Sequence, residues 1–171
     1  MIYLFGVFLL LRGRLSDTSL WVLVALMALL GLSLFMRLGM IWIKSPDYNA
    51  FLRDWIIQMQ QYDGTDVLAA EIGNYNVPYV YLLFLIAKLR PHHGLFYIKA
   101  ASILFDLVMA YAASGLVGTC KKGRIASTAA FFLALALPTV VLNSAWWAQC
   151  DAIYTSLALL GLLFGLKVKA V

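Results

Sequence analysis

Residues 20–56 read LWVLVALMALLGLSLFMRLGMIWIKSPDYNAFLRDWI and contain the change in character that decides the fold. The first part, Leu20–Ile43, is predominantly apolar and, at about 24 residues, long enough to cross a bilayer as a helix. At Lys44 the apolar run stops, and the polar stretch Ser45-Pro46-Asp47-Tyr48 follows at once. We therefore predict a membrane span that leads directly into an element at the membrane surface.

A surface helix is predicted over residues 46–62. Ser45 followed by Pro46 is typical of a helix start, and Gly64 of a helix end. The apolar side chains recur at the i, i+3, i+4 and i+7 spacing of one helix face, at Tyr48, Phe51, Leu52, Trp55, Ile56 and Met59. Polar residues occupy the other face, so this helix is expected to lie in the membrane surface rather than to cross it.

The composition requires a bilayer for the rest of the chain as well. Hydrophobic residues make up 64% of the 171 residues and charged residues only 12%, whereas soluble domains average roughly 45–50% and about 25%. Because backbone groups in lipid must be hydrogen-bonded within their own segment, the predicted fold class is all-α. We expect residues 1–171 to form one membrane-embedded domain, a polytopic transmembrane helical bundle with an interfacial amphipathic helix. The basic residues do not form the aromatic-interleaved face of a nucleic-acid binder.

Further segments complete this prediction. Residues 95–118 and 125–145 are expected to be full spans and residues 153–166 a shorter one, whereas residues 77–89 are short for a crossing. Residues 2–11 are too few to cross, and indicate either an interfacial stub or a late start within a longer reading frame.

Basic residues predict the orientation. If residues 77–89 only dip into the membrane, the basic groups near residues 12–14, 121–124 and 167–169 share one side. That side is cytoplasmic by the positive-inside rule, which makes the N-terminus cytoplasmic and places Asp47 and Asp151 at the outer face. If residues 77–89 cross fully, the rule is broken. We favour the first arrangement, in a bacterial cytoplasmic membrane.

Neither a disulfide nor a metal site is expected. Cys120 and Cys150 bracket an apolar helix that rises about 30 Å, and a disulfide needs Cα atoms within about 7 Å. His92 and His93 are adjacent and therefore cannot share a helix face. No cofactor is predicted.

Asp47 is the leading candidate for a functional carboxylate. A helix N-terminus favours an anion, and a carboxylate at the membrane surface can accept a proton from a hydroxyl nucleophile as a general base. The alternative is that Asp47 only caps the surface helix. The residues alone leave both interpretations open.

Two aromatic stretches supply further candidates. GNYNVPYVYLL, residues 73–83, offers Tyr75 and Tyr79 either as belt residues of the headgroup layer or as stacking faces and hydroxyl donors for a sugar ring. NSAWWAQCDAIYT, residues 143–155, places Trp147, Gln149 and Asp151 where one predicted span ends and the next begins. Tryptophans there are ordinary anchors, but a carboxylate at that depth also indicates a binding role.

Charges inside the predicted spans require partners. Arg37 is about 10 Å from the outer end of its span, by helical rise, which is near enough for its side chain to snorkel outward. Asp106 is near mid-span, where a charge costs roughly 2.5–3.5 kcal/mol, and Lys99 on the same helix face offsets it only in part. Helix–helix packing, a protonated carboxyl and a catalytic role all remain open for Asp106.

Four blocks of sequence in this order resemble bacterial integral-membrane glycosyltransferases of the C-type superfamily (GT-C), the mannosyltransferase-like enzymes that use polyprenyl-phosphate sugars. The blocks are SPDYNAFLRDW, GNYNVPYVYLL, IKAASILFDLVMAY and LPTVVLNSAWWAQCDAIYT, within residues 37–166. Val77 and Ala148 depart from the proline and glycine that are usual in that family. Its members are several hundred residues long, so the chain corresponds to their N-terminal module.

The resemblance implies inverting transfer of a sugar from a polyprenyl-phosphate donor to a glycan or glycolipid acceptor, with Asp47 as the catalytic base and no metal. Residues implied in substrate binding are Arg37, Tyr48, Tyr75, Tyr79, Trp147, Gln149 and Asp151. A non-catalytic membrane subunit or a transporter-like fragment is the alternative. A transporter is expected to show paired interrupted helices, and only one short segment is evident.

Overall fold

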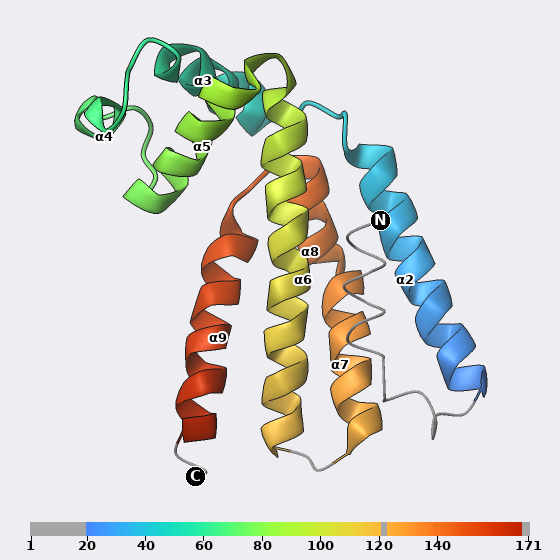
Figure 1. Cartoon of the computed structure of the whole chain (residues 1–171). Helices are drawn as coiled ribbons and strands as arrows, with labels where there is room; N and C mark the ends of the chain where they lie inside the picture. Colours follow the sequence, from blue (N-terminus) through green and yellow to red (C-terminus); the bar gives the residue numbers. More distant parts are fainter. Residues whose placement is uncertain (1–19, 121–122, 169–171) are drawn as a thin grey trace.

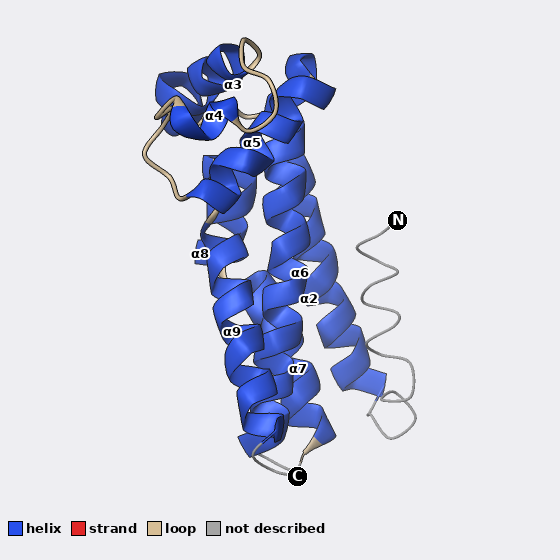
Figure 2. Ribbon diagram, turned by 60° about the vertical axis from the view of Figure 1, so that its left-hand side comes forward, coloured by secondary structure: helices blue, strands red, loops and turns tan. Residues whose placement is uncertain are grey.

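The computed structural model describes residues 20–120 and 123–168, and every regular element in these ranges is helical (Figure 1, Figure 2). This confirms the predicted all-α class for the described residues. The helices of the bundle are α2 (Leu20–Met40), α6 (Gly94–Cys120), α7 (Arg124–Ala136) and α9 (Asp151–Val168). The short elements are η1 (Tyr48–Leu52), α3 (Arg53–Met59), α4 (Asp66–Ala69), α5 (Val77–Leu89), η2 (Pro91–His93), α8 (Pro138–Val141) and η3 (Leu142–Trp147). The predicted stub at residues 2–11 lies outside the described ranges.

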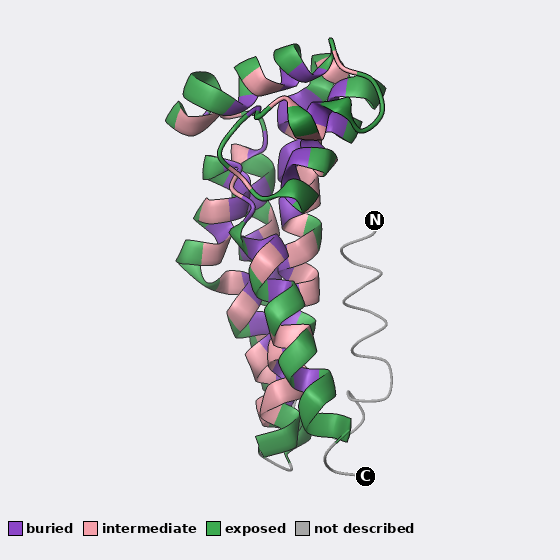
Figure 3. Ribbon diagram, turned by 90° about the vertical axis from the view of Figure 1, so that its left-hand side faces the viewer, coloured by how far each residue is buried: buried purple, intermediate pink, exposed green. Residues whose placement is uncertain are grey.

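Three of the described helices are long and apolar enough to cross a bilayer: Leu20–Met40, Pro91–Cys120 and Asp151–Val168. Their outer faces expose large apolar side chains, such as Trp21 (80% exposed) and Phe35 (75% exposed). Figure 3 shows that exposed and half-buried residues cover much of the outside of the bundle. Apolar surface of this extent indicates a lipid environment.

The segment predicted as one span over residues 125–145 is broken. α7 ends at Ala136, and the helix that resumes at Pro138 is bent by 47° from it. The cause is local: a residue before proline is forced out of the helical region, and Leu137 has φ −56° and ψ 124°. The prediction of one straight span over residues 125–145 did not include the bend before Pro138.

The surface elements lie at one end of the bundle. Figure 1 shows α3 across this end, with α5 beneath it, while α6 and α9 run away towards the opposite end. Leu52, Ile56 and Met59 from η1 and α3 are buried in one apolar cluster with Leu83 of α5 and Ile98 of α6. The predicted apolar stripe therefore packs the surface helix onto the bundle. α5 lies at the same end of the bundle as the surface helix.

A buried ion pair connects α2, α6 and η3. Arg37 Nη2 lies 2.9 Å from Asp106 Oδ2, and the Ser144 hydroxyl donates to the same oxygen at 2.6 Å. Arg37 also donates to the Leu135 carbonyl at 3.0 Å and to the Ser33 hydroxyl. Arg37 does not snorkel outward, because its side chain is 2% exposed and paired within the bundle.

Lys99 does not offset Asp106. Its ammonium group donates to the backbone carbonyls of Met40 at 2.9 Å and Ile43 at 2.6 Å. These carbonyls lie where α2 ends, and the last carbonyls of a helix have no partner within it. Lys99 therefore fixes the exit of the first span against α6.

Close contacts between helices hold the opposite end of the bundle. Ser114 and Ser127 exchange hydroxyl-to-carbonyl hydrogen bonds, each 2.7 Å, between α6 and α7. A methyl group on Gly115 would lie 2.6 Å from Leu163 of α9. A side chain at position 115 would therefore force the Leu163 side chain to move at the α6–α9 contact.

Replacing Asp106 by alanine is expected to destabilise the protein by about 3–5 kcal/mol, because it leaves the Arg37 guanidinium buried without its carboxylate. The measurement is unfolding in mixed detergent micelles, followed by circular dichroism. The matched control is Asp63→Ala, which breaks the exposed Lys88–Asp63 pair of the same length, 2.9 Å, at a cost below about 1 kcal/mol. Equal losses in the two variants would contradict a structural role for the buried pair.

Candidate functional site

Ser45, rather than Asp47, caps the surface helix. The Ser45 hydroxyl accepts a hydrogen bond from the Tyr48 backbone N–H at 3.2 Å, as an N-cap serine does. The same hydroxyl donates to the Trp147 carbonyl at 2.9 Å. Asp47 makes no side-chain hydrogen bond to the helix start, so its carboxylate is available for other partners.

The Asp47 carboxylate is held by Gln149, a residue 102 positions later in the chain. Gln149 Nε2 donates to Asp47 Oδ2, and its Oε1 accepts a hydrogen bond from the Tyr75 hydroxyl at 2.8 Å. The Gln149 backbone carbonyl accepts a bond from Ser102 of α6 at 2.7 Å. Three predicted site residues thus form one hydrogen-bonded chain, Tyr75–Gln149–Asp47.

The turn that carries Gln149 has an unusual backbone. Ala148 has φ 61° and ψ 36°, the left-handed region, and its side chain is fully buried. Glycine adopts this region most readily, so a non-glycine residue here is uncommon. The turn places Gln149 against Asp47 immediately after η3.

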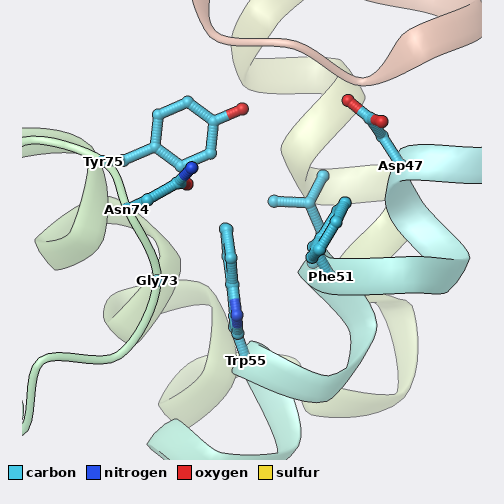
Figure 4. A pocket seen from close by; sticks show the side chains of 7 residues that line it. Asp47, Phe51, Trp55, Gly73, Asn74 and Tyr75 are labelled. Atoms are coloured by element: carbon cyan, nitrogen blue, oxygen red, sulfur yellow. The ribbon is translucent and has the colours of Figure 1, made fainter.

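A pocket of about 340 Å³ opens beside Asp47. Figure 4 shows the Asp47 carboxylate and the Tyr75 hydroxyl on opposite sides of this space, with the rings of Phe51 and Trp55 below it in this view. The lining residues come from the surface helix and from the loop before α5: Asp47, Phe51, Leu52, Trp55, Gly73, Asn74 and Tyr75.

Aromatic rings form the wall of the pocket. The centroids of Phe51 and Trp55 are 5.9 Å apart, and Trp55 meets Tyr75 edge-on at 5.8 Å. Tyr75 in turn meets Tyr79 edge-on at 4.9 Å. Such a wall offers a flat apolar face beside a carboxylate, an arrangement that suits a ring with both C–H faces and hydroxyl groups.

Tyr75 is a hydrogen-bond donor at any physiological pH. Burial raises the pKa of its hydroxyl to about 12, and the nearby Cys150, Asp47 and Asp151 act in the same direction. The protonated phenol therefore maintains its bond to Gln149 Oε1, and this bond leaves the Gln149 amide nitrogen to face Asp47.

Other predicted site residues lie outside this pocket. Arg37 is in the buried ion pair, and Tyr79 is 3% exposed behind Tyr75. Tyr48 is half-buried at the start of η1, and Trp147 contributes its carbonyl rather than its ring. Asp151, at the start of α9, accepts a bond from Asn143 at 2.7 Å and lines a separate cavity.

Several lining residues were not singled out from the sequence. Phe51 and Trp55 belong to the predicted apolar stripe, but their position at its edge, facing the loop before α5, follows only from the tertiary structure. Gly73 begins the stretch GNYNVPYVYLL, in which only Tyr75 and Tyr79 were predicted to be functional. The φ of Gly73 is 79°, and a methyl group at this position would lie 3.2 Å from the Trp55 ring. Both features favour glycine here.

The comparisons with known proteins do not identify a family. No protein-family model matches the sequence, and neither a curated protein nor a solved structure matches it. Within the described ranges, no three or more His, Cys, Asp or Glu side chains are grouped so as to hold a metal ion.

Gly73→Ala is expected to destabilise the protein by at least about 1 kcal/mol, because alanine is strained at positive φ and its methyl group would press on the Trp55 ring. Gly39→Ala in α2 is the matched control: nothing lies within 4 Å of a Cβ there, so alanine stabilises the helix by up to about 1 kcal/mol. Unfolding in mixed micelles measures both. The same sign of change in the two variants would contradict the described conformation at Gly73.

Proposed function

We propose that this chain is the N-terminal module of a membrane glycosyltransferase of the C-type superfamily, in which Asp47 is the general base. The observation that carries the proposal is the state of Asp47: its carboxylate is released from helix capping, is held by Gln149 and lines an aromatic pocket. A carboxylate that only stabilised the surface helix would have no need of the Tyr75–Gln149 chain.

The proposed reaction transfers a sugar from a polyprenyl-phosphate donor to a hydroxyl group of a glycan or glycolipid acceptor. The acceptor oxygen attacks the anomeric carbon, while the bond from that carbon to the phosphate oxygen breaks and polyprenyl phosphate departs. Asp47 takes the proton of the attacking hydroxyl. Attack opposite the leaving group inverts the anomeric configuration.

The position of the pocket suits such substrates. A lipid-linked donor stays in the bilayer and a polar acceptor stays in water, so the reaction must take place at the interface. The surface helix and the loop before α5 line the pocket, and these elements lie at one end of the apolar bundle (Figure 1). Trp55 and Tyr75, whose rings meet edge-on, line the pocket, and the face of an aromatic ring can stack against a sugar ring.

Asp47→Asn is expected to lower sugar transfer by about 10²–10⁴-fold, the usual contribution of a general base, while the fold is retained because asparagine has nearly the same shape. The measurement is transfer of labelled sugar from a polyprenyl-phosphate donor in membranes that contain the full-length enzyme of which this chain is proposed to be the module. Asp54→Asn, an exposed position on the same surface helix, is the control and should keep normal transfer. Near-normal turnover of Asp47→Asn would show that Asp47 is not the base.

We also propose that the Asp47 end faces outward from a bacterial cytoplasmic membrane, with the N-terminus in the cytoplasm. Arg124 at the start of α7 and Lys167 near the end of α9 lie at the opposite end of the bundle (Figure 1). Basic residues are enriched on the cytoplasmic side.

A membrane-impermeant maleimide tests this orientation. Cys120 is exposed at the end of α6 and should be labelled only after cells are permeabilised. A cysteine introduced at the exposed Asn49, in a Cys120→Ser background, should be labelled in intact cells, whereas the buried Cys150 stays unreactive. Labelling of Cys120 in intact cells would reverse the orientation.

A transporter-like membrane subunit is the second candidate. The 47° break between α7 and α8 favours it, because interrupted helices line substrate and ion sites in many transporters. Normal uptake of a solute together with no sugar transfer by the wild-type chain would favour this function over the first.

A further inference from the structure

A second cavity, of about 260 Å³, lies between α6, α9 and the helix that resumes after the α7 break. Two pairs of polar residues line it at four-residue spacing: Thr139 and Asn143 on α8 and η3, and Asp151 and Thr155 on α9. Thr139, Asp151 and Thr155 are exposed, so the cavity is open on that side. Residues four apart share a helix face. Asp106 of α6 completes the polar lining.

Two buried oxygen atoms of this lining lack a donor among the described residues. Asp106 Oδ2 accepts hydrogen bonds from Arg37 and Ser144, whereas Oδ1 of the same carboxylate accepts none. Asn143 donates through Nδ2 to Asp151 at 2.7 Å, but its Oδ1 has no partner. A buried acceptor without a donor costs about 1–3 kcal/mol, so both atoms indicate a missing ligand.

The charge of the cavity is negative. Arg37 compensates Asp106, but neither ion pair in the described part of the chain includes Asp151. No lysine, arginine or histidine lines the cavity. The lining therefore carries one uncompensated negative charge, that of Asp151. This charge would repel an anionic ligand such as a phosphate.

We propose that this cavity binds a small monovalent cation of the sodium type. Carboxylate, amide and hydroxyl oxygens are the ligands that hard cations prefer. One surplus negative charge balances a monovalent ion, whereas a divalent ion would leave a net positive charge at membrane depth, which is costly. Since a water molecule takes about 30 Å³, the cavity has room for a cation that keeps part of its hydration shell.

The break at Pro138 explains how the ligands come together. It redirects the second half of the span towards α9, so that Thr139 and Asn143 face Asp151 and Thr155 across the cavity. Non-helical backbone at membrane depth is tolerated where it lines such a cavity. The cation would bind whether or not the chain transfers sugar, so this proposal does not depend on the proposed function.

Thermal unfolding of the purified full chain in detergent tests the proposal. Melting is measured at increasing NaCl, with choline chloride keeping the ionic strength constant. A ligand that binds only the folded state raises the melting temperature with its concentration, so a saturable rise with Na⁺ and none with choline is the expected result. Equal melting temperatures in both salts would overturn the proposal.

Variants locate the site. Thr155→Val keeps the shape but removes one oxygen ligand, and Asp151→Asn removes the surplus charge; each should raise the Na⁺ concentration for half-maximal stabilisation by at least about tenfold. Asp54→Asn, an exposed acid on the surface helix, is the control and should leave it unchanged. Unchanged midpoints in the cavity variants would show that sodium acts elsewhere.

The preference for a monovalent over a divalent cation can be tested separately. Asn143→Asp adds a second surplus carboxylate, and this variant should gain saturable stabilisation by Ca²⁺ that the wild-type chain lacks. Equilibrium binding of ²²Na⁺ gives a measure that does not depend on unfolding, with saturation at one ion per chain expected. Stabilisation of the wild type by Ca²⁺ but not by Na⁺, or no saturable ²²Na⁺ binding, would overturn the assignment of a monovalent ion.

Discussion

The buried pair of Arg37 and Asp106 is the constraint on which the arrangement of this bundle depends. Two charges of opposite sign cannot be left apart in an apolar interior, because an unpaired buried charge costs several kcal/mol. Their contact at 2.9 Å joins α2 to α6, and Ser144 adds η3 to the same carboxylate. Apolar contacts, which are not directional, make up most of the bundle. The ion pair and its hydrogen bonds are directional, so this cluster determines which helices are neighbours and how they are aligned along their axes.

The hydrogen bonds at the outer rim follow from that alignment. With α2 fixed on α6, the Met40 and Ile43 carbonyls reach Lys99. With η3 fixed on α6, the Trp147 carbonyl reaches Ser45 and the Gln149 carbonyl reaches Ser102. The loops at residues 43–45 and 147–149 are thereby held side by side, although about a hundred residues separate them. Asp47 and Gln149 meet because these loops do.

The irregular turn after η3 serves two polar sites. Gln149 faces the aromatic pocket beside Asp47, whereas Asp151, two residues later, faces the cavity beneath Asp106. The left-handed Ala148 and the start of α9 at Asp151 give these neighbouring side chains different directions. Gln149 lies in the turn itself, whereas Asp151 is the first residue of α9.

The sequence by itself determined the helical class, the apolar segments and the stripe of the surface helix, because these depend on local composition and on periodicity along one segment. It also singled out Asp47, Tyr75 and Gln149 as separate candidates. Only the tertiary structure decided that they form one hydrogen-bonded chain and that Arg37 pairs with Asp106. These outcomes depend on contacts between residues 69 to 102 positions apart, and the periodicity of a segment carries no information about which other segment its polar atoms will meet.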